Sequence, residues 1–218
     1  MKNRLMTLAS FRAAVRQADQ DGSRFEPCPV RASLPVEIAA VGDEGSRTLD
    51  FVISSDAVMR NGDRINVDGW KLDNYRKNPV MLWAHDDNVL PIARAINTRV
   101  EGRRLITRAE FVPADLSPFA DKVYRHYKDG YLNTVSAGWM PLKWAFIDTP
   151  ERSGIDFMEQ ELLEFSAVTV PNNAEALVQH MVERDLNAAL DALVAESPEA
   201  PPSIAIERHR LEMLRLSF

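Results

Sequence analysis

The chain has 218 residues, 45% of them hydrophobic and 27% charged, which is the composition of a globular protein of one domain with appendages. Its formal net charge of −6 excludes the overall basic surface of a dedicated nucleic-acid binder. A single cysteine, Cys28, excludes an internal disulfide, and no spacing of cysteine and histidine predicts a zinc site. No apolar run reaches the roughly 18 residues of a membrane span, and the N-terminal sequence lacks the apolar core of a signal peptide, so we expect a cytoplasmic protein.

The N-terminal part combines one helical pattern with a turn-rich stretch. Between residues 5 and 20, apolar side chains recur at helical spacing beside several arginines, which predicts a short basic amphipathic helix. Such a helix either packs on the domain surface or is a segment that binds a partner or is removed. Residues 21–47 carry turn formers and prolines, and we expect a linker there with at most one short strand.

The central part predicts a sheet interrupted by one helix. Between Arg47 and Val112, short β-rich runs alternate with turn signals, as in a barrel or sandwich. A helix is predicted from Asp115 or Ser117, each a possible N-cap, to Gly130, with Pro118 in its first turn. Two further runs of strand character follow. The pattern favours a mainly β fold with helices.

The C-terminal part predicts helices. Apolar residues recur at mostly helical spacing after Pro171, the proline-containing stretch 198–202 breaks the pattern, and the last residues can form one more helix. The predicted organisation is therefore an N-terminal helix and linker over residues 1–47, a β core over 48–178 and a helical tail over 179–218.

His85 is the histidine placed best for chemistry. It ends the apolar strand PVMLWA and is followed by Asp86, Asp87 and Asn88, so its imidazole should lie where a strand leaves the core. A neutral imidazole at such a point can accept a hydroxyl proton, although a structural role fits the same position. The remaining histidines lie in polar helical segments: His126, His180 and His209.

Ser136 is the candidate nucleophile. It lies in LNTVSAGWM, just after the predicted central helix, with Ala137 and Gly138 behind it. Small neighbours let a substrate backbone approach and leave backbone N–H groups for a developing oxyanion. A Ser-Ala-Gly run in a strand also fits a bulge or a tight packing point.

Glu164 is the candidate acid. In an extended strand, Glu164 shares a face with Ser166 and Val168 and interrupts a stripe that should be apolar. A buried carboxylate needs a partner, and either an imidazole N–H or an arginine would serve. Glu161, on the opposite face of a regular strand, is the second choice.

Five motifs in order carry a family resemblance: DRINVDGW, NYRKNPVMLWAHD, PIAR, YLNTVSAGW and ELLEFSAVTVPNNAEAL. Over about residues 48–178 the chain resembles the prohead proteases of tailed phages, which are distantly similar in fold to the herpesvirus maturation proteases. The resemblance implies a small antiparallel β-barrel of the herpesvirus-protease-like type with helical appendages. It also implies a Ser-His-acid triad of Ser136, His85 and Glu164, with backbone N–H groups near Ala137 and Gly138 as the oxyanion hole.

The resemblance further implies a role in capsid maturation. Members of the family cut the scaffolding segment of the major capsid protein, and usually themselves, inside the immature prohead in the host cytoplasm. We therefore expect the capsid protein and further copies of the chain as partners, and no metal or organic cofactor. A catalytically silent assembly or scaffolding protein that keeps the barrel is the alternative, and an unrelated β-barrel binding module is a third possibility.

Overall fold

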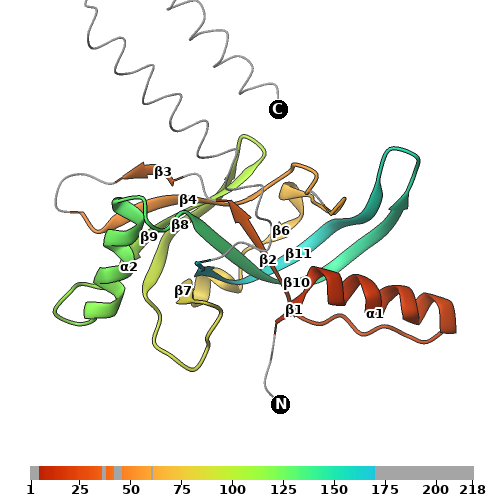
Figure 1. The fold of residues 1–218 in the computed structure, drawn as a ribbon, viewed down its shortest axis with the longest axis horizontal. Helices are drawn as coiled ribbons and strands as arrows, with labels where there is room; N and C mark the ends of the chain where they lie inside the picture. The colour runs from red at the N-terminus through yellow and green to blue at the C-terminus, as the bar shows by residue number, and fades with distance from the viewer. Residues whose placement is uncertain (1–4, 36–37, 42–45, 60, 170–218) are drawn as a thin grey trace, which may run out of the picture. The chain divides into compact units, whose positions relative to one another are not determined.

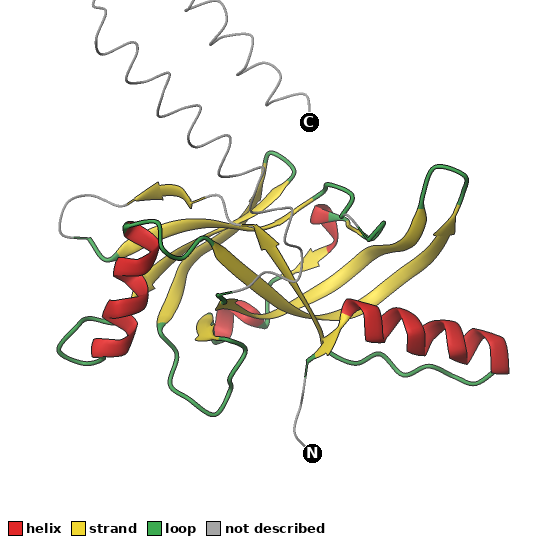
Figure 2. Cartoon of the chain, viewed as in Figure 1, coloured by secondary structure: helices red, strands yellow, loops and turns green. Residues whose placement is uncertain are grey.

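The computed structural model describes residues 5–35, 38–41, 46–59 and 61–169. Strands are the main secondary structure of this part of the chain, and two α-helices accompany them (Figure 2). The mainly β fold with few helices is therefore confirmed. The predicted C-terminal helices lie outside the described residues, and the division into residues 1–47, 48–178 and 179–218 stays a prediction.

The strands form one mixed sheet. They are β1 (Met6–Thr7), β2 (Val30–Pro35), β3 (Ile38–Val41), β4 (Thr48–Ser55), β5 (Arg64–Ile65), β6 (Trp70–Lys71), β7 (Val80–Trp83), β8 (Ala93–Glu101), β9 (Arg104–Phe111), β10 (Thr134–Asp148) and β11 (Ser153–Ala167). The helices are α1 (Leu8–Asp21) and α2 (Pro118–Lys128), and two 3-10 turns are η1 (Val67–Gly69) and η2 (Tyr75–Lys77).

The sheet is open, so the closed antiparallel barrel predicted from the sequence is wrong. The strand order is β1-β2-β10-β11-β7-β8-β9-β4-β3, and in the described part of the chain β1 and β3 do not pair with each other. In addition, β5, β6 and β7 run parallel to β11. Alternating side chains reveal which face of a strand is buried, but the period is the same in parallel and antiparallel sheets and says nothing about whether the edges meet.

The open sheet curls over an aromatic core. The rings of Phe51 on β4 and Phe165 on β11 lie 6.1 Å apart although three strands separate β4 from β11 in the sheet. Tyr127 of α2 joins this core, with its ring 5.0 Å from that of Phe51. The Phe165 face of β11 is thus the core face, and the alternate residues Glu164 and Ser166 belong to the other face.

Helix α2 confirms the central helix expected from the sequence. The side chain of Ser117 caps its N-terminus by accepting a hydrogen bond from Ala120 N at 3.2 Å, and Pro118 occupies the first turn. The Tyr127 hydroxyl donates to Thr134 O at 2.7 Å and so fixes the start of β10, two residues before Ser136. In the described residues, neither this helix nor α1 is long and apolar enough to span a membrane.

Helix α1 packs along the hairpin of β10 and β11 (Figure 1). Leu8, Phe11 and Val15 are buried, and the Phe11 ring lies 5.3 Å from Trp144 and 5.7 Å from Phe157. The helix predicted at residues 5–20 is therefore a packing element in this structure. The stretch 21–47, expected to be a linker, contributes β2 and β3 to the sheet.

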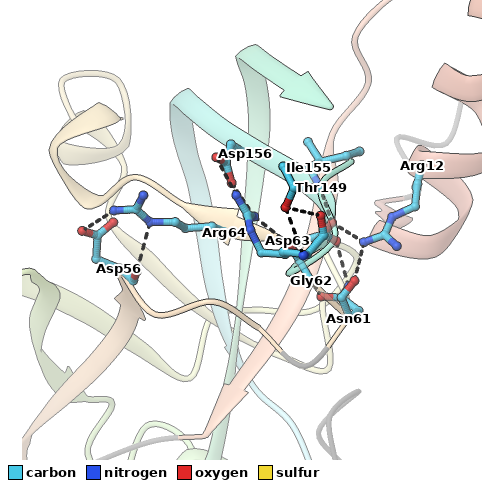
Figure 3. A network of polar contacts seen from close by, with 10 residues as sticks. Arg12, Asp56, Asn61, Gly62, Asp63, Arg64, Thr149, Ile155 and Asp156 are labelled. Carbon is cyan, nitrogen blue, oxygen red and sulfur yellow. Dashed lines mark hydrogen bonds and ion pairs between the residues drawn. The ribbon is translucent and has the colours of Figure 1, made fainter. Parts of the chain in front are cut away.

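A buried carboxylate fastens this helix to the hairpin (Figure 3). Asp63 is fully buried and forms an ion pair with Arg12 of α1. The same carboxylate accepts hydrogen bonds of 2.8 Å from Asn61 Nδ2 and from the backbone N–H of Ile155 on β11. Its charge is thus fully compensated by groups from three separate segments.

Candidate active site

His85 is held in an unusual backbone conformation just after β7. Ala84 and His85 have positive φ angles of 54° and 59°, which costs L-residues about 1–2 kcal/mol each. Backbone hydrogen bonds from Ala84 N to Ala167 O and from Asp86 N to Trp83 O secure the turn at 2.9 and 3.0 Å. Unfavourable backbone geometry of this kind is concentrated at functional sites, where the surrounding structure enforces it.

The imidazole of His85 contacts Glu164. His85 Nδ1 lies 2.8 Å from Glu164 Oε1, and the two side chains are only 5% and 10% exposed. A carboxylate accepts hydrogen bonds, so the proton of a neutral imidazole lies on Nδ1 and the lone pair on Nε2. The contact therefore leaves Nε2 available to accept a proton from another group.

Ser136 lies on the same face of the sheet. In the antiparallel pairing of β10 with β11, Ser136 is opposite Ser166 and Gly138 is opposite Glu164. Side chains that are directly opposite in a sheet point to the same face. Ser136, Ser166 and Glu164 consequently share one face, and His85 joins them through its contact with Glu164.

The hydroxyl of Ser136 is fully buried and, among the described residues, has no hydrogen-bond partner. A hydrogen bond between Ser136 and His85 is thus not formed in this structure. Leaving a buried hydroxyl unpaired costs about 1–3 kcal/mol. Such groups are infrequent in native structures, and one that shares a sheet face with a histidine–carboxylate pair is a candidate for a role in chemistry.

Gly138 makes room for the Glu164 carboxylate. A Cβ atom at this position would lie 2.1 Å from Glu164 Oε1 and 3.0 Å from Leu5 Cδ1, so a side chain here would displace the acid. Ala137 is buried in the core. Since β2 and β11 flank this part of β10, its backbone N–H groups point toward neighbouring strands. The oxyanion role of Ala137 and Gly138 stays a prediction.

Glu161, the second candidate acid, has a different partner. It accepts a hydrogen bond of 2.8 Å from Asn74 Nδ2. A register shift between Gly138 and Trp139 separates Glu161 from Glu164 on the paired strands, so the strict alternation assumed from the sequence fails there. Glu161 and Glu164 are therefore distinguished by their partners, Asn74 and His85, and not by their positions along β11.

The other histidines are less informative. His126 lies on α2, with Nδ1 2.7 Å from Lys122 O, and its contact is exposed. His180 and His209 are outside the described residues. Among the residues that the structure describes, no cluster of three or more His, Cys, Asp and Glu side chains could hold a metal ion.

The structure also identifies two residues near the site that the sequence reasoning did not assign. Ser166 contacts both His85 and Glu164. The alternation of β11 already placed it beside Glu164, which was the available signal. Tyr75 is the second residue. Burial raises the pKa of its phenol well above the usual value, and the charge of nearby Glu164 raises it further, so the phenol stays neutral.

With this geometry established, comparison with known proteins gives the family. The family model described as caudovirus prohead serine protease matches residues 70–191, more than half of the chain. The chain belongs to this family. The matched region includes His85, Ser136 and Glu164.

Individual relatives agree with this membership. The chain is 28% identical over 212 residues to the prohead protease of Escherichia phage T5, covering 93% of this chain and 96% of that protein. It is 27% identical over 167 residues to the capsid polyprotein of Pseudomonas phage PAJU2, covering 73% of this chain but only 24% of the polyprotein.

A solved structure supports the fold. The capsid assembly protease of bacteriophage T4 superposes with a TM-score of 0.50 at 16% identity, over 67% of this chain and all of that one. At this level of identity the likeness concerns the fold alone.

Proposed function

We propose that the chain is a serine endopeptidase in which Ser136 is the nucleophile, His85 the general base and Glu164 the acid that orients His85. The observation that carries the proposal is the buried His85–Glu164 hydrogen bond of 2.8 Å on the sheet face that also bears the unpartnered Ser136 hydroxyl. Such triads are identified by geometry and role, so the order His, Ser, acid along the chain is no obstacle.

In the proposed mechanism, Ser136, His85 and Glu164 act in both steps, acylation and deacylation. His85 Nε2 accepts the Ser136 proton as Oγ attacks the scissile carbonyl, and Glu164 stabilises the imidazolium that forms. His85 then gives this proton to the leaving amine, and water hydrolyses the acyl-enzyme by the same route. Backbone N–H groups near Ala137 and Gly138 are proposed to stabilise the oxyanion, which requires one of them to leave the strand ladder.

Substrate entry requires a change from the described conformation. Ser136 is not exposed, and Leu5 approaches Gly138 beside the Glu164 carboxylate. A peptide must reach Ser136 Oγ in an extended conformation, so residues that cover this face have to move first. The missing hydrogen bond between Ser136 and His85 belongs to this closed form, since catalytic hydrogen bonds are often long or absent before substrate binds.

The proposed substrate is the scaffolding segment of the major capsid protein. Support comes from the prohead protease of phage T5 and from the capsid polyprotein of phage PAJU2, a quarter of which the chain matches. Cleavage would take place inside the immature prohead, in the cytoplasm of the host. The proposed kinship in fold with the herpesvirus maturation proteases rests on the motifs of the sequence.

Self-cleavage is proposed as well. Within residues 16–47, the ranges 16–21, 30–35 and 38–41 belong to α1 or to strands, which protects them from a protease. Within the described part of this range, residues 22–27 are mostly exposed and connect α1 to β2. Among the described residues, this connection is the best candidate for the cleavage site. The predicted range 179–205 remains a second candidate.

Co-expression with the major capsid protein of the same phage tests the proposal. We expect mass spectrometry to find a capsid protein shortened at one defined site, together with shortened forms of the protease. The Ser136→Ala variant should leave both proteins at full length, which excludes a contaminating protease. An intact capsid protein in both samples would favour the catalytically silent scaffolding protein.

A further inference from the structure

Two serines face each other across β10 and β11, and their surroundings differ. Ser136 and Ser166 are opposite in register, and both are completely buried. Ser136 Oγ has no hydrogen-bond partner among the described residues, whereas Ser166 Oγ has two. The Ser136 hydroxyl is thus available for reaction, whereas the Ser166 hydroxyl already forms two hydrogen bonds.

The two hydrogen bonds of Ser166 link the Glu164 carboxylate to the backbone of His85. Its hydroxyl donates to Glu164 Oε2 at 2.6 Å, which leaves Oε1 of the same carboxylate for the imidazole. It also accepts the backbone N–H of His85 at 3.1 Å. Ser166 therefore holds the carboxylate by one oxygen and the backbone of the histidine by its amide.

These contacts explain how His85 keeps its position. The left-handed backbone of Ala84 and His85 is unfavourable for residues with a Cβ atom, and it needs fixed partners to persist. Ser166 supplies one partner from the neighbouring strand, since β7 and β11 are paired in parallel with Ser166 opposite Leu82. A hydroxyl donates to the carboxylate and accepts the amide N–H with a single atom, which a thiol does only weakly.

We propose that Ser166 is a positioning residue that aligns His85 and Glu164 toward Ser136. This inference rests on the proposed function, because alignment matters only if the three groups react together. Ser166 is not a second nucleophile, since its proton is already donated to Glu164. A misplacement of about 1 Å in a catalytic group costs on the order of 100-fold in rate, so the loss of either contact should be measurable.

The first experiment measures the reactivity of Ser136 with a fluorophosphonate probe. Ser136 Oγ attacks phosphorus, fluoride leaves and the hydroxyl proton passes to His85, so labelling reports activation of the serine without a known peptide substrate. We expect the Ser166→Ala variant to label Ser136 roughly 100-fold more slowly at saturating probe, with an unchanged concentration for half-saturation. Ser166→Thr keeps the hydroxyl and should restore most of the rate.

Ser54→Ala is the matched control. Ser54 is also a buried serine in a strand, and its hydroxyl has no hydrogen-bond partner among the described residues. Its removal deletes a buried hydroxyl remote in sequence from the site, so labelling should proceed at the wild-type rate. If the Ser166→Ala variant does not fold, Ser166→Cys replaces it, because a thiol fills the space but is only a weak donor and acceptor.

The second experiment observes the His85 Nδ1 proton by NMR and needs no catalysis. A proton shared with a buried carboxylate should give a downfield resonance in Ser136→Ala protein, which cannot cut itself. We expect Ser166→Ala or Ser166→Cys, added to this background, to shift or remove the resonance, and Ser54→Ala to leave it unchanged. An unchanged resonance together with wild-type labelling would overturn the proposal for Ser166.

The two experiments separate the two hypotheses. Wild-type protein that is not labelled at Ser136 and also leaves the co-expressed capsid protein intact would contradict the proposed peptidase, whatever the NMR spectrum shows. A resonance that depends on Ser166 would still establish that Ser166 orients the His85–Glu164 pair. Labelling at the wild-type rate in folded Ser166→Ala protein would contradict the positioning role while leaving the peptidase intact.

Discussion

Two buried carboxylates in this protein show how a structural acid differs from a candidate catalytic one. Asp63 is fully buried and is compensated by the Arg12 guanidinium, the Asn61 amide and a backbone N–H (Figure 3). Glu164 is nearly as buried, but its partners are the His85 imidazole and the Ser166 hydroxyl.

The partners decide what each acid can do. A guanidinium keeps its proton at every relevant pH, so Asp63 holds α1 to the hairpin and has nothing to exchange. An imidazole can accept a proton and give it up again, so the pair of Glu164 and His85 can change its charge during a reaction. Glu164 also shares its sheet face with the unpartnered hydroxyl of Ser136, which is a candidate to react with the His85–Glu164 pair.

The largest effect is expected from Glu164→Gln. The amide keeps the shape but removes the charge that stabilises imidazolium and fixes the tautomer of His85, so turnover should fall by about 10⁴-fold. The rate of capsid-protein cleavage by purified protein measures it.

Asp63→Asn is the matched change at the structural acid. It should unfold at lower urea concentration, yet cleave at the wild-type rate per folded molecule. Equal losses of turnover in the two variants would remove the distinction between the two acids.

Breaking the ion pair between Arg12 and Asp63 is expected to lower stability without changing cleavage. Arg12→Met leaves Asp63 buried without its cation, which should lower the free energy of unfolding by about 3 kcal/mol. Urea unfolding followed by circular dichroism provides the measurement. A variant as stable as the wild type would show that α1 is held by its apolar face alone.

A smaller loss is expected when the acid is displaced rather than neutralised. Gly138→Ala introduces a Cβ atom 2.1 Å from the present position of Glu164 Oε1, so the carboxylate must move and its contact with His85 must lengthen. We expect labelling of Ser136 by the fluorophosphonate probe to slow by about 100-fold. Ala145, which lies farther along β10, offers a control in Ala145→Ser. A wild-type rate for Gly138→Ala would argue against the importance of the Glu164 contact.

Glu161→Gln should have no measurable effect on cleavage. Its carboxylate accepts a hydrogen bond from Asn74 at an exposed contact, and a glutamine oxygen can accept the same bond. Cleavage assays run beside Glu164→Gln compare the two acids directly. A large loss in Glu161→Gln with normal turnover in Glu164→Gln would transfer the role of the acid to Glu161.

Local signals in the sequence were enough for the helices and for the buried position of Glu164. Ser117 and Pro118 begin α2 as expected, and Gly130 follows its end with a φ of 79°. Along β11, strict alternation assigned Glu164 and Ser166 to one face, and their contacts agree. Each of these features depends on residues that are close together in the chain.

Contacts between distant residues could not be derived in this way. Glu164 and His85 are 79 positions apart, and only the family resemblance suggested that they meet. The left-handed turn at Ala84 and His85 has little signal in its residue types, because alanine disfavours a positive φ and histidine adopts one only occasionally. The open edges and parallel pairs of the sheet escape prediction too, since alternation is the same for every topology.

The most direct test of the proposed triad is a crystal structure of the protein after reaction with the fluorophosphonate probe. Our account predicts phosphorus bonded to Ser136 Oγ, with His85 Nε2 within about 2.6–3.2 Å of an oxygen of the adduct or of Oγ. His85 Nδ1 should keep its contact with Glu164. Phosphorus on another serine, or an imidazole of His85 turned away from modified Ser136, would contradict the account.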